Sequence, residues 1–431
     1  MSKLTLCLII FVITIIGFAT AGKRYSITAV AMGSMVLMVL TGCLSADGAL
    51  ACFSNKNVIL MAAMFVVSAG LNKTQMINKV TTGIVRVAKG SFQKILVGYV
   101  LLAVIMISFI PSVMVTITVV IPLAAAVCRE LKVSPSKLLF PIALAGIGSC
   151  MVIPTNMVVT QVAQINGYFE AYGYTQQMMT MKDFIICRLP GAIAVLLMAI
   201  FVVPRMAPDH QIDAAQIEEK GKTLEIAQLD PVREVIGYVT FIVVLLGLMF
   251  SSKIGIPTWA IALCGAVVLS FSGVLKKEEV INSMNLSMVL LFVGALGIGT
   301  ALSETGVSEL IGKKLSEIVL ATKNNYLAGL ILFLVPFILT QFMMNNGVAA
   351  IFQPLYVMIA QSLGCNPIGI LMLATTAYMT SFLSPLATPA IPVVMAMGNY
   401  SQKDLFKMGV IPALFVTVCV VFVTMTLYPI F

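Results

Sequence analysis

The sequence has little charge and almost no histidine, and both shortages exclude classes of protein. Only 10% of its 431 residues are charged, and its single histidine, His210, lies in a polar stretch. Soluble domains carry roughly 25% charged residues, so an ordinary soluble fold is excluded. The single histidine also excludes Ser-His-Asp catalysis and histidine-based metal binding within a membrane.

Cysteine clusters and paired catalytic groups are missing as well. The 9 cysteines are scattered, mostly in or beside apolar runs, and form no Cys-x-x-Cys or Cys/His cluster. The sequence therefore predicts neither a disulfide framework nor a resident metal or cofactor. The apolar runs also lack the nucleophile–base pair or paired acids that an intramembrane enzyme needs, so we expect no enzymatic activity.

Apolar residues dominate what remains. They make up 60% of the chain, and the mean hydropathy is +1.06. A membrane-spanning helix needs about 20 apolar residues. The runs predict an all-α polytopic membrane protein with about ten spans, at 4–21, 26–46, 57–71, 137–166, 184–203, 235–250, 257–275, 286–302, 367–397 and 405–431. Two further runs, 95–127 and 326–362, have the length of re-entrant hairpins that enter and leave on one side.

The distribution of charge predicts how the chain crosses the membrane. The net charge of +9 indicates basic cytoplasmic loops rather than a nucleic-acid partner, and the loop charges place both termini outside. The chain then divides into a first repeat at 1–205, a hydrophilic cytoplasmic linker at 206–232 and a second repeat at 233–431. Five spans per half is an odd number, so the second half enters the membrane inverted relative to the first.

Prolines at matching positions favour this internal repeat. Pro122 and Pro354 follow the two hairpin tips, and Pro135 and Pro367 open the two broken spans. Each pair is separated by nearly the same length of chain, which is typical of an internal repeat. We therefore predict inverted repeats like those of secondary transporters, with the binding site where two broken spans meet near the membrane midplane.

Polar and proline-rich interruptions of the apolar runs mark the candidate site. Non-helical backbone at membrane depth is tolerated only inside protein or beside a wet cavity. Its amides, hydroxyls and carbonyls suit a small solute or ion, although proline kinks and polar packing between helices give the same pattern. The candidate substrate-binding residues are Ser112, Thr155, Asn156, Asn345, Asn346, Ser384 and Thr388. The candidate sodium site is the unwound chain at Asn346, Gly347 and Thr388.

The tips and breaks contain no lysine or arginine. We therefore expect amides, hydroxyls, helix N-termini and co-bound cations to balance the charge of an anionic substrate. Arg188, near the outer end of the fifth predicted span, is expected to extend its side chain to the membrane surface.

The interruptions resemble the divalent anion:sodium symporters of solute carrier family 13. That family carries a Ser-Asn-Thr motif at each hairpin tip and a Gly-Thr-Pro-Pro-Asn-like break in the following span. Here Asn345-Asn346-Gly347 stands at the second tip and Pro111-Ser112-Val113 at the first. Ile153-Pro154-Thr155-Asn156 resembles the first break, and residues 381–390 resemble the second. The likeness covers residues 25–431.

The resemblance implies a homodimer in the cell membrane that carries small di- or tricarboxylates or sulfate by an elevator mechanism, with sodium as the coupling ion. The altered first tip favours proton coupling or exchange more than two intact motifs would. Short loops are typical of a protein of the bacterial inner membrane. A permease for another oxyanion, such as arsenite, and a passive anion channel of the same fold are the alternatives.

Overall fold

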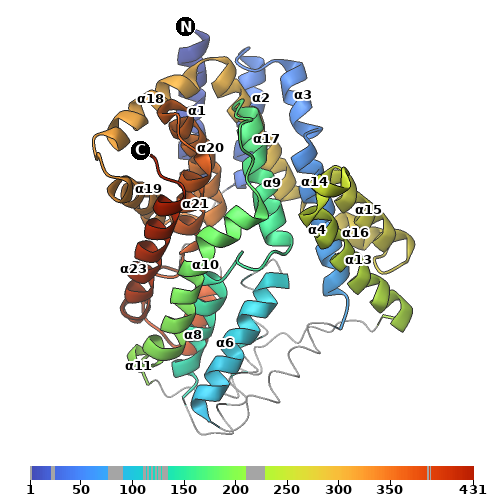
Figure 1. The fold of residues 1–431 in the computed structure, drawn as a ribbon, viewed down its shortest axis with the longest axis vertical. Coiled ribbons are helices and arrows are strands. Elements are labelled where there is room, and N and C mark those ends of the chain that lie inside the picture. The colour runs from blue at the N-terminus through green and yellow to red at the C-terminus, as the bar shows by residue number, and fades with distance from the viewer. Residues whose placement is uncertain are drawn as a thin grey trace.

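The computed structural model describes residues 2–20, 25–75, 91–109, 134–209, 229–385, 388 and 390–431, with scattered positions between 113 and 128. Throughout these residues the regular structure is helical (Figure 1). Six helices are long and apolar enough to cross a membrane: Ala46–Asn72, Phe92–Phe109, Met181–Met206, Pro231–Met249, Leu286–Glu304 and Gln402–Leu427. The prediction of an all-α chain with several helices able to span a membrane is therefore confirmed, whereas the number of ten spans stays a prediction. Ser112, most of the predicted linker and residues 110–112 of the predicted first hairpin lie outside the described residues.

The first half of the chain forms helices over its apolar runs. They are α1 (Lys3–Thr20), α2 (Ile27–Leu40), α3 (Ala46–Phe53), α4 (Lys56–Asn72), α6 (Phe92–Phe109), α8 (Ser136–Gly148), α9 (Asn156–Ala171), α10 (Met181–Leu197) and α11 (Val203–Met206). A π-helical turn, Met198–Val202, joins α10 to α11. Residues 149–155 separate α8 from α9 and interrupt the predicted span 137–166. We call them the first break.

The second half is also built of helices over its apolar runs. Its helices are α13 (Pro231–Met249), α14 (Ser251–Ile254), α15 (Thr258–Phe271), α16 (Lys277–Ser283), α17 (Leu286–Glu304), α18 (Val307–Leu320), α19 (Asn325–Thr340), α20 (Asn345–Leu363), α21 (Pro367–Met379), α22 (Ala390–Gly398) and α23 (Gln402–Leu427). Residues 341–344 form the tip between α19 and α20. The second break lies between α21 and α22, and its described residues are 380–385 and 388.

Matching caps begin the last long helix of each half. Thr180 and Asp183 form a capping box at the start of α10, and Ser401 and Asp404 form one at the start of α23. Each box satisfies backbone N–H groups that the first helical turn leaves without partners. The two helices pack together and run in opposite directions (Figure 1).

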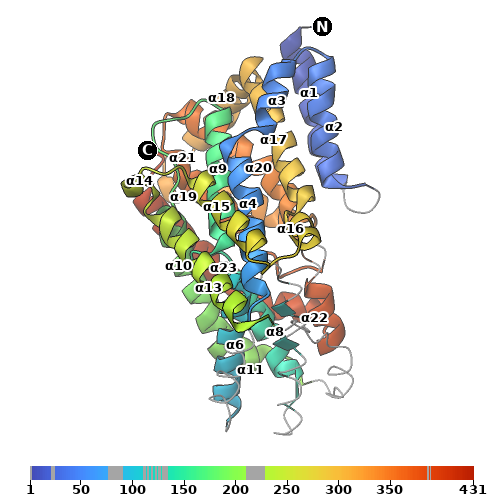
Figure 2. The ribbon, with the colours of Figure 1, turned by 90° about the vertical axis from the view of Figure 1, so that its right-hand side faces the viewer.

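Both breaks lie at mid-height in the elongated molecule (Figure 2). In that view α9 lies above α8, whereas α22 lies below α21, so the two broken segments run in opposite senses. The start of α8 is held against the end of α22 by the Tyr400 hydroxyl, which donates to the Ser136 carbonyl. The rings of Phe140 and Tyr400 also pack edge to face, with centroids 6.3 Å apart. The halves are thus joined at the start of α8 and just after α22, at the ends of these helices that lie away from the breaks.

Candidate functional site

The tip between α19 and α20 is bound to the second break by side chains. Asn345, the first residue of α20, donates from Nδ2 to Ser381 Oγ at 2.9 Å. Its Oδ1 accepts from Thr340 Oγ1 at 2.9 Å. The Thr340 hydroxyl also lies 3.1 Å from the carbonyl oxygen of Tyr378, at the end of α21. These contacts supply partners for polar groups that the end of α21 exposes inside an apolar core.

Gln341 makes a second bridge between the same segments. Its Nε2 donates to the Thr380 carbonyl at 3.0 Å, and its Oε1 accepts from the Leu383 N–H at 3.2 Å. A single buried side chain therefore pairs with a carbonyl and an amide of the unwound backbone. The sequence analysis did not select Gln341, although its place directly after the last turn of α19 was a usable signal.

A glutamine and tyrosine cluster connects the two halves next to this tip. Gln353 of α20 donates from Nε2 to the Tyr378 hydroxyl at 2.9 Å and lies 3.3 Å from Gln161 Oε1 of α9. The Tyr378 hydroxyl also lies 3.3 Å from Gln161 Oε1. All three side chains are buried. Because each comes from a different helix, the cluster fixes α9, α20 and α21 to one another beside the breaks.

The first break presents polar groups without partners. Thr155 and Asn156 are each 2% exposed, and Thr155 Oγ1 and both amide atoms of Asn156 lack hydrogen-bond partners. Thr155 is the N-cap of α9, yet its side chain makes no capping bond. Buried polar atoms of this kind are rare, and each one calls for a bound water, an ion or a function. Both residues were predicted from the sequence to bind substrate.

Arg188 lies in the core, so the expectation that it reaches the membrane surface is wrong. The residue is 3% exposed, and its Nη2 donates to the Cys150 carbonyl in the first break at 2.8 Å. Its Nε and Nη1 have no partner. The spacing along α10 was an available signal, because Arg188 is four residues after Phe184 and seven before Val195, on one buried stripe.

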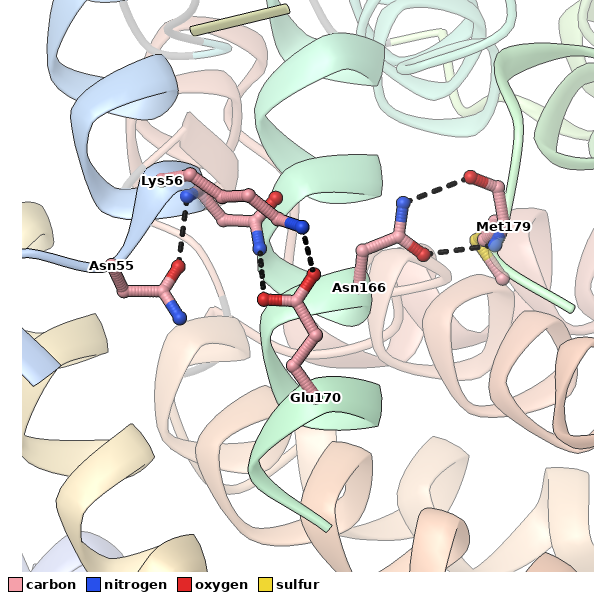
Figure 3. Close-up of polar contacts among 6 residues, drawn as sticks. Asn55, Lys56, Asn166, Glu170 and Met179 are labelled. Atoms are coloured by element: carbon pink, nitrogen blue, oxygen red, sulfur yellow. Dashed lines mark hydrogen bonds and ion pairs between the residues drawn. The ribbon is translucent and has the colours of Figure 1, made fainter. Parts of the chain in front are cut away.

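The end of α9 is held from two sides (Figure 3). Glu170 forms an ion pair with Lys56 at 2.9 Å, and its other oxygen accepts from Asn57 Nδ2 at 3.3 Å. Asn166 bonds both the N–H and the carbonyl of Met179, at 2.8 and 2.9 Å. The position of the first turn of α9 at the break is therefore fixed by contacts far from the break.

Asn346 has different surroundings from Asn345. Its Nδ2 lies 3.4 Å from Met288 Sδ of α17, rather than contacting the second break. It also lines a cavity of about 680 Å³, whose other polar lining residues are Tyr25, Ser26, Thr28, Asn285 and Ser287. Cavities of this size suit small ligands. The structure thus separates two residues that the sequence placed in one constellation.

The remaining candidates occupy the second break and its flank. Thr388 is buried, and its Oγ1 accepts from the Ala390 N–H at 3.4 Å, at the start of α22. Ser384 is half-buried. The Gly347 N–H bonds the Met344 carbonyl at 2.9 Å as α20 begins. Within the described part of the chain, His, Cys, Asp and Glu form no group of three that would hold a metal ion. The sodium assignment stays a prediction.

Known proteins resemble this chain along its whole length. A family profile described as "CitMHS: Citrate transporter" matches residues 8–335 and 245–431. An uncharacterized transporter of Haemophilus influenzae is 24% identical over 419 residues, which cover 92% of this chain and 85% of that protein. The solved structure of the Alcanivorax borkumensis YdaH transporter superposes with a TM-score of 0.63 at 14% identity, covering 98% of this chain and 96% of that one. This last likeness shows a shared fold.

Shorter matches reach the family proposed from the motifs. Human solute carrier family 13 member 1 is 28% identical over 143 residues, 33% of this chain and 24% of that protein. The sodium-dependent high-affinity dicarboxylate transporter 3 of Caenorhabditis elegans is 29% identical over 123 residues, 28% of this chain and 21% of that protein. The resemblance to this family is therefore confirmed. With its profile matched from residue 8 to residue 431, the chain belongs to the citrate transporter family.

Proposed function

We propose that this multi-pass membrane transporter is a secondary active carrier of small di- and tricarboxylates. One observation carries the proposal: both breaks lie at mid-height in the molecule (Figure 2), and buried polar side chains bond each of them, Asn345 the second and Arg188 the first. Polar backbone interruptions at the centre of an apolar helical protein are where transporters hold their substrates. The relatives are named as transporters, which favours this function over an intramembrane enzyme.

The chemistry of the cluster suits a small anion. A charge at the centre of a bilayer costs at least ~2.5–3.5 kcal/mol, so a site must replace the lost water with donors. Thr155, Asn156 and Asn346 bring hydroxyl and amide groups, and the N-terminus of α9 brings backbone N–H groups. Ser112, Asn345, Ser384 and Thr388 complete the proposed substrate set, and a sodium ion at Asn346, Gly347 and Thr388 is proposed as the coupling ion.

The proposed architecture is ten spans with two re-entrant hairpins in two inverted repeats. The opposite directions of α8–α9 and α21–α22, and of α10 and α23, support this arrangement (Figures 1 and 2). Such symmetry gives two equivalent states that open to opposite sides, which is the basis of alternating access. We propose an elevator-type movement, a homodimer and a bacterial inner-membrane location as parts of the same hypothesis.

Labelled citrate and succinate uptake into proteoliposomes tests this function. One run imposes an inward sodium gradient on empty vesicles, and the other removes sodium and preloads the unlabelled anion. Uptake in the first run alone means symport, and uptake in the second alone means exchange. Uptake that neither saturates nor shows counterflow means a channel. If the folded protein takes up neither anion, the carboxylate proposal is wrong and oxyanion substrates become the better hypothesis.

Asn346→Ala tests the placement of the site. We expect it to abolish uptake and leave folding intact, because Asn346 lines the cavity at the tip and bonds only the Met288 sulfur. Asn55→Ala is the control, since Asn55 caps α4 (Figure 3) and does not line this cavity. Normal uptake by Asn346→Ala contradicts the proposed site, whatever the wild-type substrate is.

A further inference from the structure

Arg188 is a buried cation that lacks a buried anion. Within the described residues, the ion pairs are Lys56–Glu170, Lys73–Glu279, Lys137–Asp209 and Lys314–Glu317, and none includes Arg188. Arginine stays protonated inside proteins, and charges taken out of water require a counter-ion or full hydrogen bonding. Its guanidinium has one carbonyl partner and leaves Nε and Nη1 without any.

The carboxylates nearest to Arg188 along the chain are already engaged elsewhere. Asp183, five residues earlier on α10, accepts from the hydroxyls of Thr180 and Tyr428, at 2.6 Å each. Glu170, at the far end of α9, is paired with Lys56. Among the described residues no carboxylate pairs with Arg188, and we take an external anion as its partner.

Other groups that attract anions surround the same position. The carbonyl of Cys150 holds Arg188 at the first break, and Cys150 Sγ lies 3.8 Å from Met157 Sδ, in the first turn of α9. This helix is 16 residues long and has no side-chain cap, so its N-terminus presents free N–H groups and the positive end of its dipole. The unpartnered Thr155 hydroxyl and Asn156 amide begin the same turn.

We propose that Arg188, Thr155 and Asn156 form an anion subsite in the first break that takes one carboxylate of the transported substrate. The assignment rests on the proposed function, because it names which part of the polar cluster carries the substrate charge. A planar carboxylate matches the fork of N–H donors that a guanidinium presents, whereas an ammonium provides only a point charge. The Thr155 hydroxyl and the α9 N-terminus then supply the remaining donors.

The subsite also explains how an unpaired arginine is tolerated. A buried charge without a partner destabilises the empty protein, and such local costs are typical of binding sites. Arg188→Met is therefore expected to be at least as heat-stable as the wild type without ligand. A structural arginine behaves in the opposite way, since its removal lowers the stability of the empty protein.

Thermal stabilisation of the purified full-length protein by citrate and by succinate measures the subsite. Arg188→Gln is expected to weaken binding of both anions by roughly tenfold or more, since a hydrogen-bonded charge is lost. Arg188→Lys is expected to fall between this variant and the wild type. Thr155→Val removes one hydroxyl and is expected to weaken binding by a smaller factor. Thr424→Val is the matched control, because its buried hydroxyl also lacks a partner but lies on α23.

Succinamide, in which amides replace both carboxylates, gives a test independent of overall affinity. The wild type is expected to prefer succinate over succinamide, and Arg188→Gln to lose part of that preference, because one carboxylate of succinate no longer meets a guanidinium. Unchanged affinity and preference in Arg188→Gln overturn the subsite, as does a fall in the ligand-free stability of Arg188→Met. Because these results are read against a wild type that takes up the anions, they leave the transport function standing. A wild type that neither binds nor transports either anion overturns both proposals.

Discussion

Asn345 and Asn346 are neighbours in the chain that the structure gives different tasks, and mutation can separate them. Asn345 makes two side-chain hydrogen bonds, to Thr340 and to Ser381. Each such bond contributes about 0.5–1.5 kcal/mol, and a buried hydroxyl left without its partner costs about 1–3 kcal/mol. Ser381 is fully buried, while the Thr340 hydroxyl keeps the Tyr378 carbonyl. Asn345→Ala is therefore expected to destabilise the protein by about 2–4 kcal/mol.

Asn346→Ala serves as the contrast on the same helix. It removes one long contact to a methionine sulfur at the wall of a cavity. The loss of stability is expected to be below about 0.5 kcal/mol, as for substitutions away from a bonded network. The stability of both variants is measured as the fraction of protein that stays monodisperse in detergent after heating. Transport is measured separately, and we expect Asn346→Ala to lose it.

A double-mutant cycle with Ser381→Ala tests the contact itself. If Asn345 and Ser381 stabilise the tip through their mutual bond, the two substitutions together cost less than the sum of the single ones, by about 1 kcal/mol. Additive effects, or an equal loss of stability in Asn346→Ala, would refute the assignment of Asn345 as the tie between tip and break.

Two further predictions concern helix packing and pH. Gly294→Ala on α17 is expected to destabilise the protein by about 1–3 kcal/mol, since the added Cβ would lie 2.7 Å from the Ala31 backbone of α2. Gly33 on α2 has open space beside it, so Gly33→Ala is expected to be neutral or stabilising in the same heating assay. The Lys73 ammonium and, to a smaller extent, the Lys276 backbone N–H lower the pKa of the Glu279 carboxyl from its ordinary value of 4.5. The Lys73–Glu279 pair therefore stabilises the protein fully above pH 4.5, and this stabilisation is lost as the pH falls through the lowered pKa. Glu279→Gln is expected to reduce slightly the loss of heat stability at acid pH. The effect is small because the pair is partly exposed. An unchanged dependence of heat stability on acid pH would contradict this prediction.

Helix ends and breaks were predictable because their causes are local. Pro135 immediately precedes α8, and Pro367 is the first residue of α21. Proline is favoured at the start of a helix because its fixed φ angle suits the first turn. The capping boxes that begin α10 and α23, with Asp183 and Asp404, are also local, because each needs only a residue and its third neighbour. The chemistry of Thr155 and Asn156 was also visible, since few polar residues interrupt the apolar runs.

The directions of side chains were less accessible. Consecutive residues of a helix point about 100° apart, so Asn345 and Asn346 point in different directions once α20 begins at Asn345. The sequence pattern left that starting point open, and the two asparagines were grouped by their chemistry. Gln341 was missed for a related reason, because its value comes from Thr380 and Leu383, which lie about forty residues further along the chain.

Arg188 shows why the charge of the site was misjudged. The expectation of an uncharged site considered only residues within the tips and breaks. Arg188 comes from α10, which packs against α8 and α9 and places the guanidinium at the first break. The second break has its polar groups bonded by Gln341 and Asn345, while the first leaves Thr155, Asn156 and Arg188 with atoms unpaired. The two breaks are therefore not equivalent in chemistry. The first is short of an anion, and the second is bonded to the tip beside it, so we expect substrate charge to be held in the first half of the chain.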